Sequence, residues 1–330
     1  MNLFRSTVIW PLAALAALLL FNAAASPGFF QLEWKDGRLF GTLVDIVNQS
    51  ARVPMLLALG MTLVIATGGI DLSVGSLMAV SGALAAMQVN RGAPLVSAVG
   101  LALLATTVLG LLNGVLVAKV RLQPIIATLV TMVAGRGLAM LLTGSQMVPF
   151  QHKGLQWLAN GTMLGLPVPV LLVPLLAVLA GLALRRTAAA LFVEATGDNE
   201  TASRFAGIRT DSVRMAVYVF SGFCAGLSGI LEASNIAAAD PARIGDTREL
   251  DAIFAVVAGG TALAGGRFSL AGSIVGALLL QTLTLTLYNQ NVPPAVAPVP
   301  KAIVILAVCL LHSPRVRAAL ARRNANAAKA

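Results

Sequence analysis

Charged and aromatic residues are scarce in this sequence of 330 residues. Asp, Glu, Lys and Arg make up 11% of the chain and aromatic residues 5%, whereas 58% is hydrophobic. A soluble domain needs more polar surface than this to stay dissolved. Single-stranded nucleic acid is bound largely by aromatic stacking, which so few aromatic residues cannot supply. The composition therefore indicates a membrane protein and argues against nucleic acid as a partner.

Residues that hold metals or carry out catalysis are also few. The chain has two cysteines and two histidines. Cys224 and Cys309 lie within apolar stretches, where buried free thiols are expected. No lysine follows a glycine, so the phosphate-binding pattern G-x-x-x-x-G-K-S/T is absent. The sequence therefore predicts no catalytic residue, no metal site and no cofactor in this chain, and any ATP would be bound by a partner subunit.

Acidic residues are rare within the apolar segments. Carriers driven by protons or sodium ions normally need acids deep within their spans. Here Glu232 lies near an outer segment end and Asp71 near an inner one. We therefore expect the energy for any transport to come from another protein.

Ten apolar segments are read as membrane-spanning helices. A bilayer core requires about 20 apolar residues per helix, and an open chain can span it only as helix. The predicted fold class is an all-α polytopic membrane protein, with residues 1–330 forming one transmembrane domain. The predicted spans are 8–25, 51–70, 72–90, 94–118, 123–143, 168–184, 213–237, 251–266, 269–290 and 299–312.

Lysine and arginine concentrate on one side of the membrane in this topology. The net charge of +10 is therefore read as the positive-inside bias and as contact with anionic lipid. The bias places both termini in the cytoplasm, together with the loop 185–212 and a basic tail at 313–330. Residues 26–50 are predicted to form a polar outer loop.

The first apolar segment also fits a signal peptide. Arg5 precedes an apolar run, and Ala23–Ser26 has the small residues of a cleavage site. Pro27, directly after that site, disfavours cleavage. A retained span and a cleaved signal both stay open, and the rest of the topology is the same in either case.

A glycine pair interrupts the second apolar segment. After Gly68 and Gly69, Asp71 or Ser73 is placed to cap the next helix. One interpretation is a tight turn between two spans. The other is a broken helix whose free amides and Asp71 face a transport pathway.

The stretch from Gly68 to Gly75, GGIDLSVG, resembles the signature of the ribose/xylose/galactose-type permeases of ATP-binding-cassette importers. Further stretches resemble its galactofuranose-transporter subgroup: Asp36–Gly41, Gln123–Pro124, Thr128–Leu129, Val133–Gly137, Leu250–Ile253 and Gly265–Phe268. The resemblance implies ten spans in a bacterial inner membrane and import of a monosaccharide such as galactofuranose. It also implies an ATP-binding subunit, a second permease chain, identical or different, and a periplasmic sugar-binding protein.

The cytoplasmic loop 185–212 contains FVEATGDNETASRFAGI, which resembles the ATPase-coupling loop of such permeases. A short helix flanked by glycines can dock in a groove of the ATPase and move as a rigid lever. Thr201 and Ser203 interrupt a pattern that is often richer in alanine. The residues that match are Glu194, Ala195, Gly197, Asn199, Ala202 and Gly207.

Polar residues within spans are candidates for lining the pathway. Arg136 lies well inside a span, where an ionisable group is a functional candidate, and Glu232 is its candidate partner. Amides and hydroxyls could exchange hydrogen bonds with a sugar, or instead join neighbouring helices. The candidates of this kind are Asn113, Gln123, Thr128, Gln281 and Asn289.

The sequence thus predicts the permease subunit of an ATP-driven sugar importer. A secondary transporter or channel that works without an ATPase is one alternative. A membrane-embedded enzyme is another, which the missing catalytic groups disfavour. A permease for a different solute, such as a branched-chain amino acid, is the nearest alternative, and the GGIDLS match speaks against it.

Overall fold

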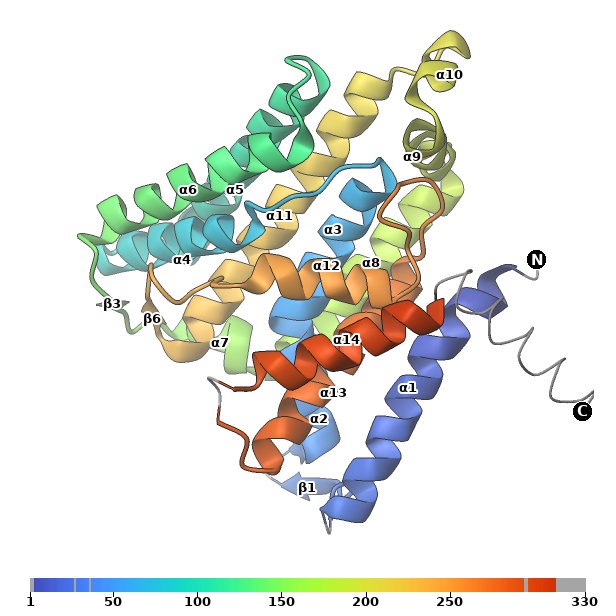
Figure 1. Cartoon of the computed structure of the whole chain (residues 1–330). Helices are drawn as coiled ribbons and strands as arrows, with labels where there is room; N and C mark the ends of the chain where they lie inside the picture. Colours follow the sequence, from blue (N-terminus) through green and yellow to red (C-terminus); the bar gives the residue numbers. More distant parts are fainter. Residues whose placement is uncertain (1–2, 27, 36, 294–295, 313–330) are drawn as a thin grey trace, which may run out of the picture.

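One buried helical rod runs through the centre of the molecule in the computed structural model, which describes residues 3–26, 28–35, 37–293 and 296–312 (Figure 1). The rod consists of α2 (Thr42–Ser50), the π-helix η1 (Ala51–Met55) and α3 (Leu56–Ala66). In its most apolar window, 94% of the residues are buried. Residues 42–50, predicted to belong to the outer loop, are therefore the start of this rod. Polar residues fit here because this end of the rod is only partly enclosed: Asp45 and Gln49 are exposed.

Seven helices are long and apolar enough to cross a membrane in the described part of the chain. Besides the rod at 42–66, they are α1 (Leu3–Ala25), α5 (Leu95–Ala118), α6 (Pro124–Thr143), α8 (Val168–Arg186), α11 (Thr210–Ile236) and α13 (Leu270–Asn289). The other three predicted spans are shorter helices of 17, 11 and 15 residues: α4 (Val74–Asn90), α12 (Arg248–Ala258) and α14 (Pro298–His312). The all-α polytopic fold is confirmed.

Helix α12 stops eight residues before the end predicted for its span. Gly260 adopts a left-handed conformation with φ of 89°, which ends the helix. Gly259 lies against the backbone of Gly272 in α13, so closely that a Cβ atom could not be accommodated. The prediction that this span continues to residue 266 is therefore wrong, and residues 259–269 form a connection to α13.

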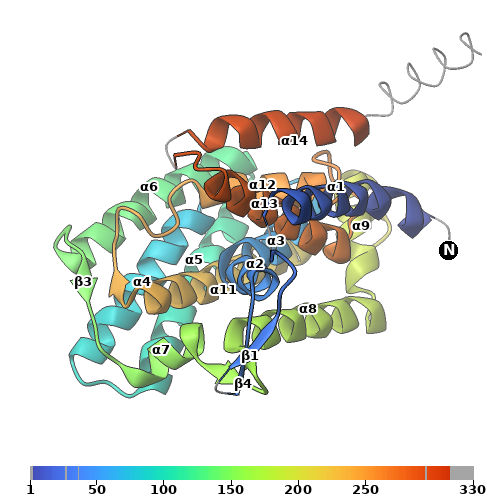
Figure 2. The ribbon, with the colours of Figure 1, turned by 90° about the horizontal axis from the view of Figure 1, so that it is seen from below.

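The long helix α11 packs against α3, α4 and α5 and so ties the rod to its neighbours. Glycines make the closest approach: a Cβ on Gly110 of α5 would lie 3.1 Å from the Cα of Gly222 in α11. Small residues allow membrane helices to approach at this distance. Viewed along the rod, α2 lies in front of α3 and the other helices surround it (Figure 2).

The two ends of the rod carry different connections, called here the α2 end and the α9 end (Figure 1). The α2 end has short antiparallel pairs and one short helix: β1 (Glu33–Lys35) with β2 (Arg38–Phe40), β4 (Thr162–Met163) with β5 (Leu166–Pro167), β3 (Val148–Pro149) with β6 (Ala238–Ala239), and α7 (Lys153–Asn160). The α9 end has α9 (Ala189–Asp198) and α10 (Glu200–Phe205), so the loop 185–212 contains two helices where one short helix was expected.

Large apolar side chains cover the outside of α5, α6 and α8. Leu104, Val133 and Leu179, for example, are more than half exposed. In contrast, the thiol of Cys224 is fully buried, as expected. The predicted tail at 313–330 and the side chain of Cys309 lie outside the part that the structure describes.

Candidate functional site

The connection from α3 to α4, called here the break loop (residues 67–73), turns at a glycine pair. Gly68 has φ of 76°, a left-handed conformation that side chains disfavour. Gly69 lies under the ring of Tyr218, and a Cβ there would be 2.7 Å from the tyrosine hydroxyl oxygen. The loop therefore needs glycine at the first position for its backbone and at the second for space.

The carboxylate of Asp71 is fully buried in the break loop. One oxygen accepts hydrogen bonds from the Ser73 amide at 3.0 Å and the Ser73 hydroxyl at 2.6 Å. The other accepts from the hydroxyl of Ser221 in α11 at 2.7 Å. Asp71 thus folds the loop back on itself, as a capping residue does, and joins it to α11. It contacts protein groups and no open space, which differs from the expectation that it faces a pathway.

Two further predicted residues join this network. The amide of Asn113 in α5 donates to the Ser73 hydroxyl at 2.8 Å. The hydroxyl of Thr128 in α6 accepts from the Leu72 amide at 3.1 Å and lies 3.2 Å from the Ile70 carbonyl oxygen. Both side chains are fully buried, so they act here as bonds between helices.

Gly75, the last residue of the predicted signature, lies in the first turn of α4. Its Cα faces the loop before α12, where the Gly245 backbone leaves no space for a Cβ. The Glu249 carboxylate would also lie 2.5 Å from such a Cβ. The structure therefore brings together Gly68, Gly69, Asp71, Ser73, Gly75, Asn113 and Thr128 as packing and bonding partners around one helix break.

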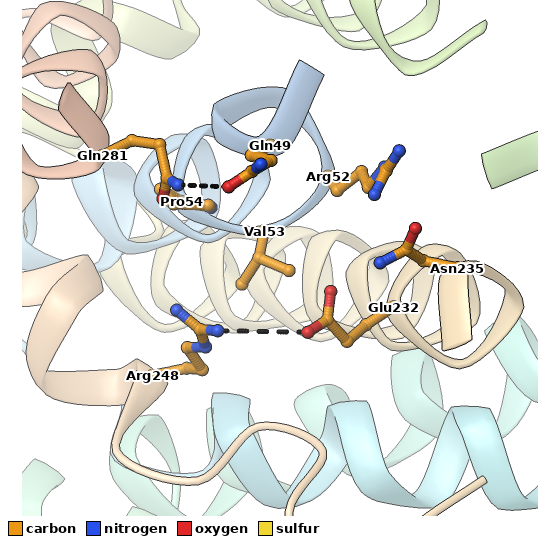
Figure 3. Close-up of a pocket in the computed structure, with 8 residues that line it drawn as sticks. All are labelled: Gln49, Arg52, Val53, Pro54, Glu232, Asn235, Arg248 and Gln281. Atoms are coloured by element: carbon orange, nitrogen blue, oxygen red, sulfur yellow. Dashed lines mark hydrogen bonds and ion pairs between the residues drawn. The ribbon is translucent and has the colours of Figure 1, made fainter. Parts of the chain in front are cut away.

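A polar pocket of about 410 Å³ lies at the α2 end of the rod (Figure 3). Six of its eight lining residues are polar or charged, and they come from α2, η1, α11, α12 and α13. Gln281 donates to Gln49 at 2.8 Å, and Arg248 lies 3.9 Å from Glu232. Val53 and Pro54 supply the apolar part of the wall. Gln281 is the one predicted pathway residue found in this pocket.

Arg52 lines the same pocket from the π-helix η1. It is 9% exposed, and its Nη2 atom donates to the Asn160 side chain at 3.2 Å. Its Nε atom is buried and has no partner among the described residues. A buried guanidinium nitrogen without a partner is costly, and π-helical segments occur often at functional sites. The Nε atom is enclosed by protein, so among the described residues it is an unsatisfied donor beside the pocket and not a group that the pocket presents.

The remaining pathway candidates lie elsewhere. Arg136 in α6 donates to the carbonyl oxygens of Pro241 at 2.7 Å and Ile244 at 2.8 Å. Its expected partner, Glu232, pairs instead with Arg248, so the predicted pair is wrong. Arg136 fixes the loop between β6 and α12 because its Nη1 atom donates to two carbonyls of that loop. Gln123 precedes α6 and is exposed, outside both the break loop and the polar pocket.

The predicted coupling residues lie on α9, α10 and the turns around them. The Asn199 side chain accepts from the Ala202 amide at 2.9 Å and so begins α10. The Ala195 carbonyl accepts from the Ser203 hydroxyl at 2.7 Å, which folds α10 back onto α9. Glu194 lies on α9, and Gly207 follows α10 with φ of 87°. Gly197 lies in the last turn of α9, directly beside the break loop.

An ion-pair network fixes α10 to its surroundings. Glu200 pairs with Arg121 at 2.6 Å, Arg214 at 2.9 Å and Arg204 at 3.2 Å. Asp211 in α11 also pairs with Arg121, at 3.1 Å, and with Arg204. The network joins the loop between α5 and α6, helix α10 and the start of α11. Networks of several charges resist solvent screening better than single exposed pairs.

Comparison with known proteins decides the family. Residues 43–311 match the family described as the permease component of a branched-chain amino acid transport system. Among curated proteins, the chain is 46% identical to the galactofuranose transporter permease protein YtfT of Escherichia coli K12, over 93% of this chain and 91% of that protein. This chain belongs to the family of transport-system permease components that residues 43–311 match. It is therefore a multi-pass membrane transport protein and not an enzyme itself.

Two further relatives of the permease are also named as sugar importers. The fructose import permease protein FruF of Bifidobacterium longum is 37% identical over 96% of this chain and 90% of its own length. The ribose import permease protein RbsC of Escherichia coli K12 is 38% identical over 92% of each chain. No solved structure matches the permease significantly.

Several residues of these two sites were not among the sequence candidates. Ser221 and Tyr218 contact the break loop from α11, and nothing in their local sequence indicates a partner about 150 residues away. Arg52 carries a clearer signal, because it is an ionisable residue at the start of a predicted span. Asn235 and Arg248 become neighbours of Arg52 only when α11 and α12 pack on the rod.

Proposed function

We propose that the permease forms the membrane path of an ATP-driven monosaccharide importer, with ATP hydrolysed by a separate subunit. The observation that carries this proposal is the identity of 46% over 93% of the chain to a galactofuranose transporter permease. Fructose and ribose import permeases, at 37% and 38% identity, support the same substrate class. The particular sugar proposed is galactofuranose or a close analogue.

The polar pocket supports a sugar over a branched-chain amino acid, the solute in the family's description. A branched aliphatic side chain needs an apolar surface to bind, whereas this wall has two apolar residues, Val53 and Pro54. A sugar offers hydroxyl groups that both donate and accept. Gln49 and Gln281 supply matching amide groups. We therefore propose this pocket as a place where the sugar contacts the permease.

The distribution of charge supports an orientation in which the α9 end lies in the cytoplasm. Basic residues gather at the α9 end, where the ion pairs and contacts of the coupling loop place Arg121, Arg185, Arg204, Arg214 and Arg267. Positive loops stay in the cytoplasm. The proposed arrangement has both termini and the α9 end in the cytoplasm of a bacterial inner membrane. The α2 end then faces the periplasm and a sugar-binding protein.

Exposed apolar side chains at the α9 end support an ATPase as partner. Phe205 at the end of α10 is 89% exposed and Leu191 on α9 is 65% exposed. Large apolar side chains at such exposure serve as anchors for a partner protein. We propose that α9 and α10 dock in the ATPase, and that a second permease chain, identical or different, completes the path.

Uptake into proteoliposomes tests the proposal. The permease is reconstituted with the ATPase, binding protein and any second permease that co-purify with it, and labelled galactofuranose, ribose, fructose and leucine are compared. We expect uptake of one of the sugars, loss of that uptake when the ATPase is catalytically inactive, and no competition by leucine. Sugar uptake that persists with an inactive ATPase would establish a secondary carrier. Competition by leucine would establish an amino acid permease.

A further inference from the structure

Three backbone segments meet at the α9 end without any side chain between them. Gly197 in α9 faces the carbonyl oxygen of Ala66, the last residue of α3, and a Cβ there would overlap that oxygen. The same Cβ would lie 2.5 Å from the Gly266 amide nitrogen. The Gly266 amide in turn donates to the Ala66 carbonyl at 2.8 Å. We name this contact of residues 66–68, 197 and 265–266 the glycine crossing.

Gly265 completes the glycine crossing. Its φ of 91° is left-handed, and a Cβ would lie 2.9 Å from the Gly68 nitrogen and 3.0 Å from the Gly197 carbonyl oxygen. Direct backbone packing has no rotatable side chains that could absorb a displacement, and packed interiors transmit strain. A movement of α9 must therefore displace the start of the break loop, or residues 262–267 of the connection between α12 and α13, or both.

The break loop passes such a displacement on through fixed bonds. Asp71 is bonded to Ser73 at the start of α4 and to Ser221 in α11. The Ile70 carbonyl and the Leu72 amide are bonded to Thr128 in α6. None of these groups exchanges bonds with solvent, because Asp71, Ser73, Ser221 and Thr128 are buried. The loop therefore moves with the helices that surround it.

Helices α9 and α10, which lie on the other side of the glycine crossing from the break loop, are also held by bonds. Glu200 of α10 pairs with Arg121 and Arg214, and Arg204 of α10 pairs with Asp211 of α11, so α10 is tied to the membrane helices. The Ser203 hydroxyl holds α10 to the Ala195 carbonyl of α9. A force applied at the exposed Phe205 of α10 consequently reaches Gly197 through two bonded helices.

We propose that the glycine crossing is the joint through which movement of α9 and α10 reaches the break between α3 and α4. In this arrangement the GGIDLS segment receives the conformational change, and Asp71 is a positioning residue that keeps the segment rigid. The sugar contacts of the polar pocket lie at the opposite end of the rod. The inference rests on the proposed function only in taking an ATPase as the source of the movement.

Gly197→Ala tests the joint in the complete transporter reconstituted in proteoliposomes. Gly197 is helical, so alanine suits its backbone and only the crossing is disturbed. We expect assembly and basal ATP hydrolysis to persist, while sugar uptake per ATP hydrolysed falls by roughly tenfold. Gly181→Ala in α8 is the matched control, because nothing lies within 4 Å of its Cβ position. An unchanged ratio of uptake to hydrolysis in Gly197→Ala would overturn the proposal.

Hydrogen exchange of the unmodified transporter gives a second test that does not depend on a variant folding. Amides of α9 and of residues 64–73 are compared in the nucleotide-free and vanadate-trapped states, with α7 at the α2 end as a reference. We expect exchange in both segments to change together. A change confined to α9, with residues 64–73 unaltered, would refute the joint. Uptake that needs no ATP would instead refute the proposed function, so the two failures are distinguishable.

Discussion

The hydroxyl of Ser221 donates to the carboxylate of Asp71 at 2.7 Å, across 150 residues of sequence. Together with the Tyr218 hydroxyl, it fixes the break loop to α11, the longest helix among the described residues. A buried carboxylate is tolerated only when its oxygens are hydrogen-bonded, so the Ser221 hydroxyl stabilises Asp71 in its buried position.

Ser221→Ala should therefore destabilise the permease. Removing one donor leaves a buried carboxylate oxygen without a partner, at a cost of about 1–3 kcal/mol of unfolding free energy. Ser234→Ala on the same helix is the control, because the Ser234 hydroxyl is buried and has no partner among the described residues. Thermal unfolding in detergent should show a lower midpoint for Ser221→Ala alone. Equal midpoints for the two variants would contradict the account of Asp71.

Gln281→Ala should weaken sugar passage through the polar pocket. Loss of one hydrogen bond, at about 0.5–1.5 kcal/mol, corresponds to a reduction of roughly two- to twelvefold. Uptake is measured at a fixed amount of loaded binding protein, with Gln146→Ala as an exposed glutamine control. If both variants transport equally, the pocket has no part in the path.

Arg136→Leu should abolish most uptake. The change leaves the Pro241 and Ile244 carbonyls without their donor, and it releases the loop that packs against Gly75. A lysine ammonium also has several donors on one nitrogen, but its side chain is shorter than that of arginine, so Arg136→Lys should retain intermediate uptake. Initial uptake rates of the three proteins, at matched amounts in the membrane, test this order. Normal uptake by Arg136→Leu would remove Arg136 from the functional residues.

Phe205→Ala should weaken the association with the ATPase. An aromatic anchor that a partner buries typically costs 2 kcal/mol or more when truncated, about thirtyfold in affinity. Phe30→Ala, at the α2 end, removes a phenylalanine that is 49% exposed and serves as control. The amount of ATPase retained on immobilised permease during washing reports the difference. Equal retention would place the docking surface elsewhere on the α9 end.

Hydropathy and glycine placement predicted much of the fold from sequence. The rod's break at Gly68 and Gly69, and helical structure in the loop 185–212, follow from local chemistry. The division of that loop into two helices at Asn199 was not predicted. The start of the rod could not be predicted from local sequence in the same way. Polar residues at 42–50 suggest a loop, but they form the first turns of the rod, where Asp45 and Gln49 stay exposed and Gln281 bonds to Gln49.

The sequence predicted which residues of the candidate site lie together better than it predicted what those residues do. Asp71, Asn113 and Thr128 do converge on one place, but as bonds between helices and not as open pathway groups. Whether a polar side chain faces a cavity or a neighbour depends on how distant helices pack. The partners of Arg136 are backbone carbonyls, which carry no side-chain signature in a sequence.

The burial of the central rod has a consequence for how the bilayer acts on this protein. Membranes differ in thickness, and helices adjust by tilting or by distorting the lipid around them. Such adjustment falls first on α5, α6 and α8, whose apolar faces lie on the outside. The rod, enclosed by protein along 50–66, meets that variation only after its neighbours have absorbed most of it. Growth conditions that alter lipid chain length should thus leave the geometry of the helix break nearly constant.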